Sequence, residues 1–174
     1  MKKIKLELSE DLKNLPKASK VLSEYAKNKV KVGVLGGNHP ISGKSFAEIG
    51  IFHEFGSVSD ITFMYKGKLI TVHGVPARSF IRVPFKKFKA NKEAYIDSIK
   101  LKILDDMQKG EYTGKAYSYA GQEIKVLMQD EFINNNWVQN KSKEYIDLKG
   151  SSTPLIDTGS LVNSINYEVV KKDE

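Results

Sequence analysis

The chain has no cysteine among its 174 residues, which excludes disulfides, thiol catalysis and cysteine-ligated zinc. Three histidines are too few for a histidine-rich metal site. No apolar run approaches the roughly 18 residues that a membrane span requires. The N-terminus alternates charged and apolar residues, so we expect no signal peptide. What is present, 40% hydrophobic and 28% charged residues, suits one globular domain over residues 1–174.

The net charge of +7 is unevenly distributed along the chain. Residues 1–92 hold 18 basic and 7 acidic residues, a net +11, whereas residues 93–174 hold 10 and 14, a net −4. Such a division suits binding to nucleic acid, to an acidic partner, or to a second copy in a head-to-tail arrangement.

Apolar periodicity predicts the order of the elements. Before residue 36, we expect a short strand from Ile4 to Leu8, a helix with Pro16 in its first turn, and a core strand over 30–35. A helix over 46–55 should turn Ile49, Phe52 and His53 inward. Residues 61–65 and 69–72 should form a hairpin around the turn 66–68. Long helices should span 90–109 and 115–134, then a polar loop 138–154, one helical turn from Leu161 and a final strand from Ile165. The predicted class is α+β: a mostly antiparallel sheet packed by two long helices on one face, with an extended hairpin.

Three motifs resemble catalytic signatures, but each lacks a feature that the catalytic site requires. Gly37 and Gly43-Lys44-Ser45 resemble a phosphate-binding loop, but five residues separate the glycines where four are needed. Asp157-Thr158-Gly159 resembles the aspartic-protease turn, but it occurs once and stands near the end of the sequence. His53-Glu54 lacks the second histidine of a zinc protease, since Ser57 stands there. We therefore expect no catalytic residue, metal or cofactor, and prefer a plain loop and a helix start as interpretations.

A basic run follows in which aromatic residues alternate with cations. Phe80, Phe85 and Phe88 lie among Arg78, Arg82, Lys86, Lys87, Lys89 and Lys92. Basic residues interleaved with aromatics can bind nucleic acid. The alternative is a solvated face whose aromatic rings point into the core.

Three segments, taken in order, resemble the virion-morphogenesis family of tailed bacteriophages. They are VGVL at 32–35 with AEIGIFHEFGS at 47–57, VPARSFIR at 75–82, and KGSSTPLIDTGSL at 149–161 followed by Asn163-Ser164-Ile165. The resemblance covers about residues 30–168 and leaves out the N-terminal extension 1–29. In this family a second proline is common where Ser79 stands, and compact relatives have a shorter link than residues 58–74.

The resemblance implies a non-enzymatic structural protein of neck, head–tail joining, tail-completion or tail-terminator type. Relatives form rings, typically hexameric, and dock on connector, neck or tail-tube proteins. The protein would reside in the virion at the head–tail junction, and in the host cytoplasm during assembly. DNA would pass nearby without specific recognition, and no membrane would be involved. The matching motif residues are Glu54, Phe55, Gly56, Pro76, Arg78, Phe80, Asp157, Thr158, Gly159 and Leu161.

These motif residues also have physical roles to fill. Gly56 would allow a sharp turn, Pro76 would fix the entry to the second motif, and Phe80 would anchor it. Asp157 and Thr158 would cap the last helical turn, with Leu161 packed inward. We expect Arg78 to pair with Glu54 or Asp157.

The predicted hairpin is the candidate for reaching a neighbouring subunit. Its candidate residues are Phe63, Tyr65, Lys66, Gly67, Lys68 and Leu69. Deleting residues 62–72 should leave a folded monomer that no longer assembles. Two other functions stay open: a basic nucleic-acid-binding accessory protein, and, less favoured, a hydrolase using Asp157 or the loop at Lys44.

Overall fold

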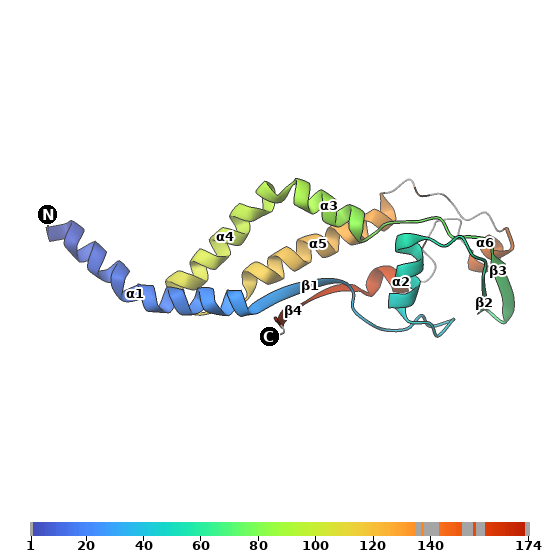
Figure 1. Cartoon of the computed structure of the whole chain (residues 1–174), viewed down its shortest axis with the longest axis horizontal. Helices are drawn as coiled ribbons and strands as arrows, with labels where there is room; N and C mark the ends of the chain where they lie inside the picture. Colours follow the sequence, from blue (N-terminus) through green and yellow to red (C-terminus); the bar gives the residue numbers. More distant parts are fainter. Residues whose placement is uncertain (1, 135–136, 138–142, 151–154, 156–158, 173–174) are drawn as a thin grey trace. The chain divides into compact units, whose positions relative to one another are not determined.

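The computed structural model describes residues 2–134, 137, 143–150, 155 and 159–172, and only the backbone of residues 2–13 and 143–145. The predicted α+β class is confirmed, with the strands in two small antiparallel sheets. Figure 1 shows the elements in chain order: α1 (Lys2–Lys27), β1 (Asn28–Val34), α2 (Phe46–Phe55), β2 (Ile61–Tyr65), β3 (Lys68–Val72), α3 (Arg82–Ala90), α4 (Lys92–Lys109), α5 (Lys115–Ile133), α6 (Lys143–Lys149), α7 (Ser160–Asn163) and β4 (Ile165–Lys171).

The chain divides into two compact units that interleave in sequence. Unit 1 comprises residues 1–31, 91–122 and 168–174, and unit 2 comprises residues 32–90 and 123–167. Strand β1 pairs with β4, and β2 pairs with β3. None of the described helices is both long and apolar enough to cross a membrane.

Unit 1 is built from α1, α4 and the first turns of α5. Its core is Val21, Tyr25 and Ala116. Three residues of α4, spaced four apart, pack against this core, as the apolar periodicity predicts: Ile99, Ile103 and Met107. Tyr112 and Tyr117 pack against it as well.

The N-terminal prediction is wrong. The strand expected from Ile4 to Leu8 is part of the 26-residue helix α1. Pro16, expected in the first turn, lies inside that helix, where it removes one backbone hydrogen bond. Alternation over five residues is too short a pattern to outweigh the longer helical context.

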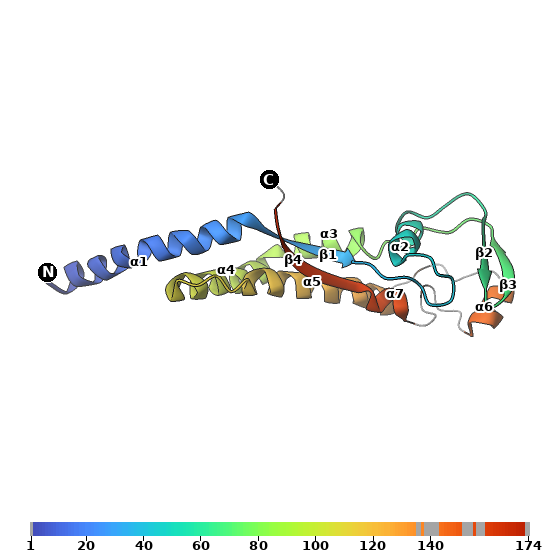
Figure 2. The same ribbon diagram turned by 90° about the horizontal axis from the view of Figure 1, so that it is seen from below.

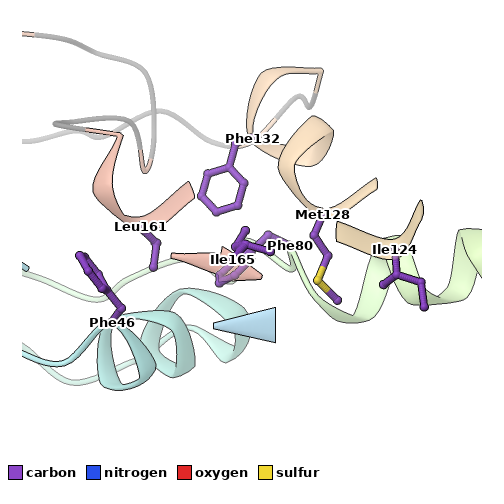
Figure 3. Close-up of a cluster of buried hydrophobic side chains, with 7 residues drawn as sticks. All are labelled: Phe46, Phe80, Ile124, Met128, Phe132, Leu161 and Ile165. Atoms are coloured by element: carbon purple, nitrogen blue, oxygen red, sulfur yellow. The ribbon is translucent and has the colours of Figure 1, made fainter. Parts of the chain in front are cut away.

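Unit 2 has a core assembled from segments far apart in sequence. Figure 3 shows side chains from α2, α5, α7, β4 and the segment preceding α3 converging on one cluster. Its buried members are Phe46, Phe80, Ile124, Met128, Phe132, Leu161 and Ile165. The rings of Phe80 and Phe132 lie 4.9 Å apart, and Trp137 packs edge-on against Phe132.

Helix α2 begins and ends at the residues that the sequence predicts. Ser45 caps it, and Glu48 returns the hydrogen bond in a capping box. The predicted inward face is only partly confirmed: Ile49 packs against the core and His53 is half-buried, but Phe52 is exposed. The fully buried position near the end of the helix is the charged Glu54.

The hairpin β2–β3 is confirmed, and its turn is tighter than expected. Tyr65 pairs with Lys68, so only Lys66 and Gly67 form the loop, both with positive φ, as a two-residue turn of this type requires. In both views the hairpin lies beside α6 (Figures 1 and 2), and Lys66 Nζ donates to the carbonyl of Leu148 at 2.7 Å. Helix α6 corrects the prediction of a continuous polar loop over 138–154.

Candidate functional site

The buried carboxylate of Glu54 is the centre of the most highly connected polar cluster in unit 2. Ser79 Oγ donates to Glu54 Oε1 at 2.6 Å, and the backbone N–H groups of Ile81 and Arg82 donate to its two oxygens at 2.9 and 3.1 Å. Arg82 Nε donates to Oε1 at 2.7 Å, and Arg82 Nη2 donates to the Glu54 carbonyl at 2.8 Å. One side chain thus ties α2 to the whole segment 79–82.

Glu54 acts as a cap for another helix. The N–H groups at Ile81 and Arg82 stand at the start of α3, where backbone donors have no partner within the helix. A carboxylate supplies the acceptor and suits the positive end of the helix dipole. Arg82 also lies over the ring of Phe55, with 4.5 Å from its guanidinium carbon to the ring centroid.

The hydrogen bonds keep Glu54 ionised. Burial alone would raise the pKa of this carboxyl group, but the hydrogen bonds from Ser79, Arg82 and Ile81 outweigh burial, so its pKa is below the ordinary value. The group is therefore a structural anion at neutral pH.

Gly56 holds the first two motif segments together from the other side. Its φ is 74°, and a Cβ there would lie 2.6 Å from the carbonyl oxygen of Val75 and 2.8 Å from the nitrogen of Ala77. The backbones of Ser57 and Val75 exchange two hydrogen bonds at 2.8 and 2.7 Å. Only glycine permits so close an approach of two backbones.

Of the two partners predicted for Arg78, Glu54 has Arg82 as the arginine on its carboxylate. Arg78 is buried, and its backbone N–H donates to the carbonyl of His53 at 2.6 Å. The alternative partner, Asp157, lies outside the described residues, so that pairing stays a prediction. Burial and then the nearby charges of Arg78 and Lys149 lower the pKa of His53 to about 3, which keeps its imidazole neutral.

The other motif residues are divided between core, surface and undescribed segments. Phe80 and Leu161 are buried in the unit 2 core, as predicted, while Pro76 is exposed. Thr158, like Asp157, lies outside the described residues. The N-cap position of α7 is Gly159, without a side-chain cap, so neither residue predicted as the cap occupies that position.

The hairpin has one buried and one exposed face. Tyr65 and Ile70 are buried within the chain, and Phe63 is half-buried on the same face. The exposed face carries Met64 and Leu69, which pair across the two strands and are 55% and 68% exposed. Of the candidate hairpin residues, Tyr65 is inaccessible to a neighbour, and the exposed ones are Lys66, Gly67, Lys68 and Leu69. Met64 was missed because alternation alone does not say which face is covered.

Two residues of the candidate basic face have acidic partners. Arg82 is bound to Glu54, and Lys87 Nζ contacts Glu131 Oε2 at 2.6 Å. Lys92 begins α4 and belongs to unit 1. The exposed Lys86 remains, with Lys89 lying over the exposed ring of Phe85 at 5.0 Å.

An open apolar groove runs between α2 and β1 within unit 2. Its volume is about 270 Å³, and its apolar lining includes Val32, Val34, Ala47, Ile51, Phe55 and Ile81. Ile51 and Phe55 are 60% and 63% exposed. Among the described residues β1 pairs with β4 alone, in a two-stranded sheet. The groove therefore offers an accessible apolar surface beside the motif cluster.

Sequence reasoning missed Ser79 and Arg82 as partners of Glu54. Pro84 was the available signal, because proline is favoured in the first turn of a helix and indicates that a helix starts near Arg82. The donors at that start need an acceptor, but nothing local in the sequence specifies which carboxylate supplies it.

Comparison with protein-family models, with curated proteins and with solved structures finds no match for this chain.

Proposed function

We propose that this chain is a non-enzymatic assembly protein of a tailed bacteriophage, acting at the head–tail junction as a neck, tail-completion or tail-terminator component. It would associate with copies of itself in a ring and dock on connector or tail-tube proteins. The protein would enter the virion from the host cytoplasm.

The observation that carries the proposal is the cluster around Glu54. Two of the three segments that resemble the virion-morphogenesis family, 47–57 and 75–82, are joined there by hydrogen bonds to the buried Glu54 and by the backbone contact at Gly56. The third segment contributes Leu161 to the same hydrophobic core as Phe80. Segments that are far apart in sequence but pack together in one cluster support the interpretation of the three segments as one family motif.

The exposed apolar side chains support association as the mode of action. Ile51, Phe55, Met64 and Leu69 are each more than half exposed in unit 2. They form two pairs, Ile51 with Phe55 on the groove and Met64 with Leu69 on the hairpin, and exposed apolar patches are typical of protein–protein contact sites. A ring needs two different surfaces of each copy that complement one another.

The test is native mass measurement with negative-stain imaging over a concentration series up to about 1 mM, where even weak contacts form. We expect closed rings of about six copies. A chain that stays monomeric throughout contradicts the proposed self-association.

Nucleic-acid binding is the second candidate, favoured by Lys86, Lys89 and Phe85 on the exposed side of α3. Its test is DNA binding by the purified chain over a range of salt concentrations, since each phosphate contact steepens the dependence on salt. The double variant Lys86→Glu, Lys89→Glu should abolish such binding, and Lys100→Glu with Lys102→Glu on α4 provides the matched control. Absence of salt-dependent binding removes this candidate.

A further inference from the structure

We propose that the groove between α2 and β1 receives the exposed face of the β2–β3 hairpin from a second copy of this chain, with Met64 and Leu69 as the inserted side chains. This inference rests on the proposed function and names its subunit contact. It assigns one surface of each copy to receive and another to insert.

The groove has the size and the character to take these side chains. An apolar cavity of about 150 Å³ holds one benzene-sized group, so the 270 Å³ of the groove has room for about two side chains. Its lining is apolar at Val32, Ala47, Ile51 and Phe55. Filling it would cover Ile51 and Phe55, two of the most exposed apolar side chains in unit 2.

The hairpin has the matching shape. Met64 and Leu69 lie directly opposite each other across the strands, so they project together from one face. Tyr65 and Ile70 on the opposite face are buried, so packing within the chain fixes the position of the hairpin and of the exposed pair. An isolated two-stranded ribbon is marginal in water, and cover on its second face would stabilise it.

Charge complementarity favours this pairing over a like-with-like contact. The exposed side of α2 carries the acidic Glu48 one turn before Ile51. The hairpin carries the exposed Lys66 at its turn, whereas the exposed Lys68 pairs with Tyr65 and so lies on the face opposite Met64 and Leu69. Two hairpin turns, each carrying Lys66, would repel each other, whereas Lys66 and Glu48 attract. The contact is therefore heterologous, the kind that closes into a ring.

Cysteine cross-linking tests this arrangement cleanly, because the chain has no cysteine of its own. We would prepare the variants Ile51→Cys and Leu69→Cys separately and oxidise them alone and mixed. The mixture should give a cross-linked dimer, and each variant alone should give at least tenfold less. Leu101→Cys, on α4 and similarly exposed, is the control and should cross-link with neither.

A second measurement, of assembly by serine variants, tests the contact even if the introduced thiols do not react. Leu69→Ser should reduce the assembled fraction at least tenfold without lowering the unfolding midpoint, and Leu101→Ser should leave assembly unchanged. Rings that form without the 51–69 cross-link and tolerate Leu69→Ser overturn this inference and leave the proposed function standing. Cross-links between two copies of Ile51→Cys also overturn it. A monomer at every concentration, without cross-links, overturns both.

Discussion

Each of the two units contains a buried carboxylate that hydrogen bonds keep ionised, and the donors of those bonds differ between the units. In unit 1 the fully buried Asp106 accepts hydrogen bonds from Tyr25 Oη, Thr113 Oγ1 and the Thr113 N–H, at 2.7 to 2.8 Å. In unit 2 Glu54 accepts from Ser79, Ile81 and Arg82. Burial raises the pKa of each group, and in both cases hydrogen bonds outweigh it and leave the pKa lowered.

The difference lies in which donors can change their role. Two of the three donors to Asp106 are hydroxyl groups, which can rotate and accept instead. Three of the four donors to Glu54 are N–H groups, which cannot. Position 54 therefore requires a carboxylate, whereas position 106 should tolerate an amide. A buried acid is specified by the chemistry of its donors and not by its burial alone.

The largest expected effect on stability comes from replacing Gly56, which lets α2 approach the segment that donates hydrogen bonds to Glu54. Gly56→Ala should lower the free energy of unfolding by about 3 kcal/mol, because a Cβ would collide with the backbone of Val75 and Ala77 in a conformation that side chains disfavour. Urea unfolding followed by the fluorescence of Trp137, the single tryptophan, measures this in unit 2. Gly43→Ala is the control, since its φ of 68° is similar but no atom lies within 4 Å of the added Cβ. Equal effects of the two changes would disprove the collision.

Glu54→Gln should come next, with a loss of about 2 kcal/mol. The amide nitrogen must face a fixed N–H group in either orientation, so one donor always opposes another. The same fluorescence measurement applies, and Glu48→Gln on the same helix is the control because glutamine preserves a capping box. A Glu54→Gln protein as stable as its control would show that the carboxylate is dispensable.

Asp106→Asn should cost less, about 1 kcal/mol, because the amide nitrogen can take the place of Oδ1, where the Thr113 hydroxyl can reorient to accept from it. Tyr25 Oη and the Thr113 N–H then continue to donate to the amide oxygen. Near-ultraviolet circular dichroism of the tyrosines packed around Tyr25 reports on unit 1. The partly exposed neighbouring residue provides the control variant Asp105→Asn. A loss larger than that of Glu54→Gln would reverse the comparison between the two sites.

The smallest effect is on the acid limb of the stability curve. Both carboxylates have folded-state pKa values below their ordinary values of 4.5 and 3.8, so their stabilisation is fully present above those values. It is lost as the pH falls through the lower folded-state values, because the unfolded chain then binds more protons. Glu54→Gln should flatten the loss of stability below about pH 4.5, and an unchanged slope would argue against an ionised Glu54.

Local signals in the sequence predicted local structure well. The turn glycine at Gly67 and the apolar steps along α4 and α5 each act within a few residues, so the pattern contains the cause. The predicted strand from Ile4 to Leu8 failed because so short a pattern fits two structures. The loop predicted over 138–154 failed because a polar helix of one or two turns has little apolar periodicity to detect.

Taken alone, the sequence determined the α+β class, the order of the main elements, the need for glycine at position 56 and the prominence of the segments around Glu54, Phe80 and Leu161. Only the tertiary structure decided that Arg82 binds Glu54, that Tyr65 is buried while Met64 is exposed, and that α2 and β1 enclose an apolar groove. The reason is physical. A capping residue or a turn acts on its own neighbours in sequence, whereas the partner of a buried charge and the covered face of a hairpin depend on which distant segment packs there.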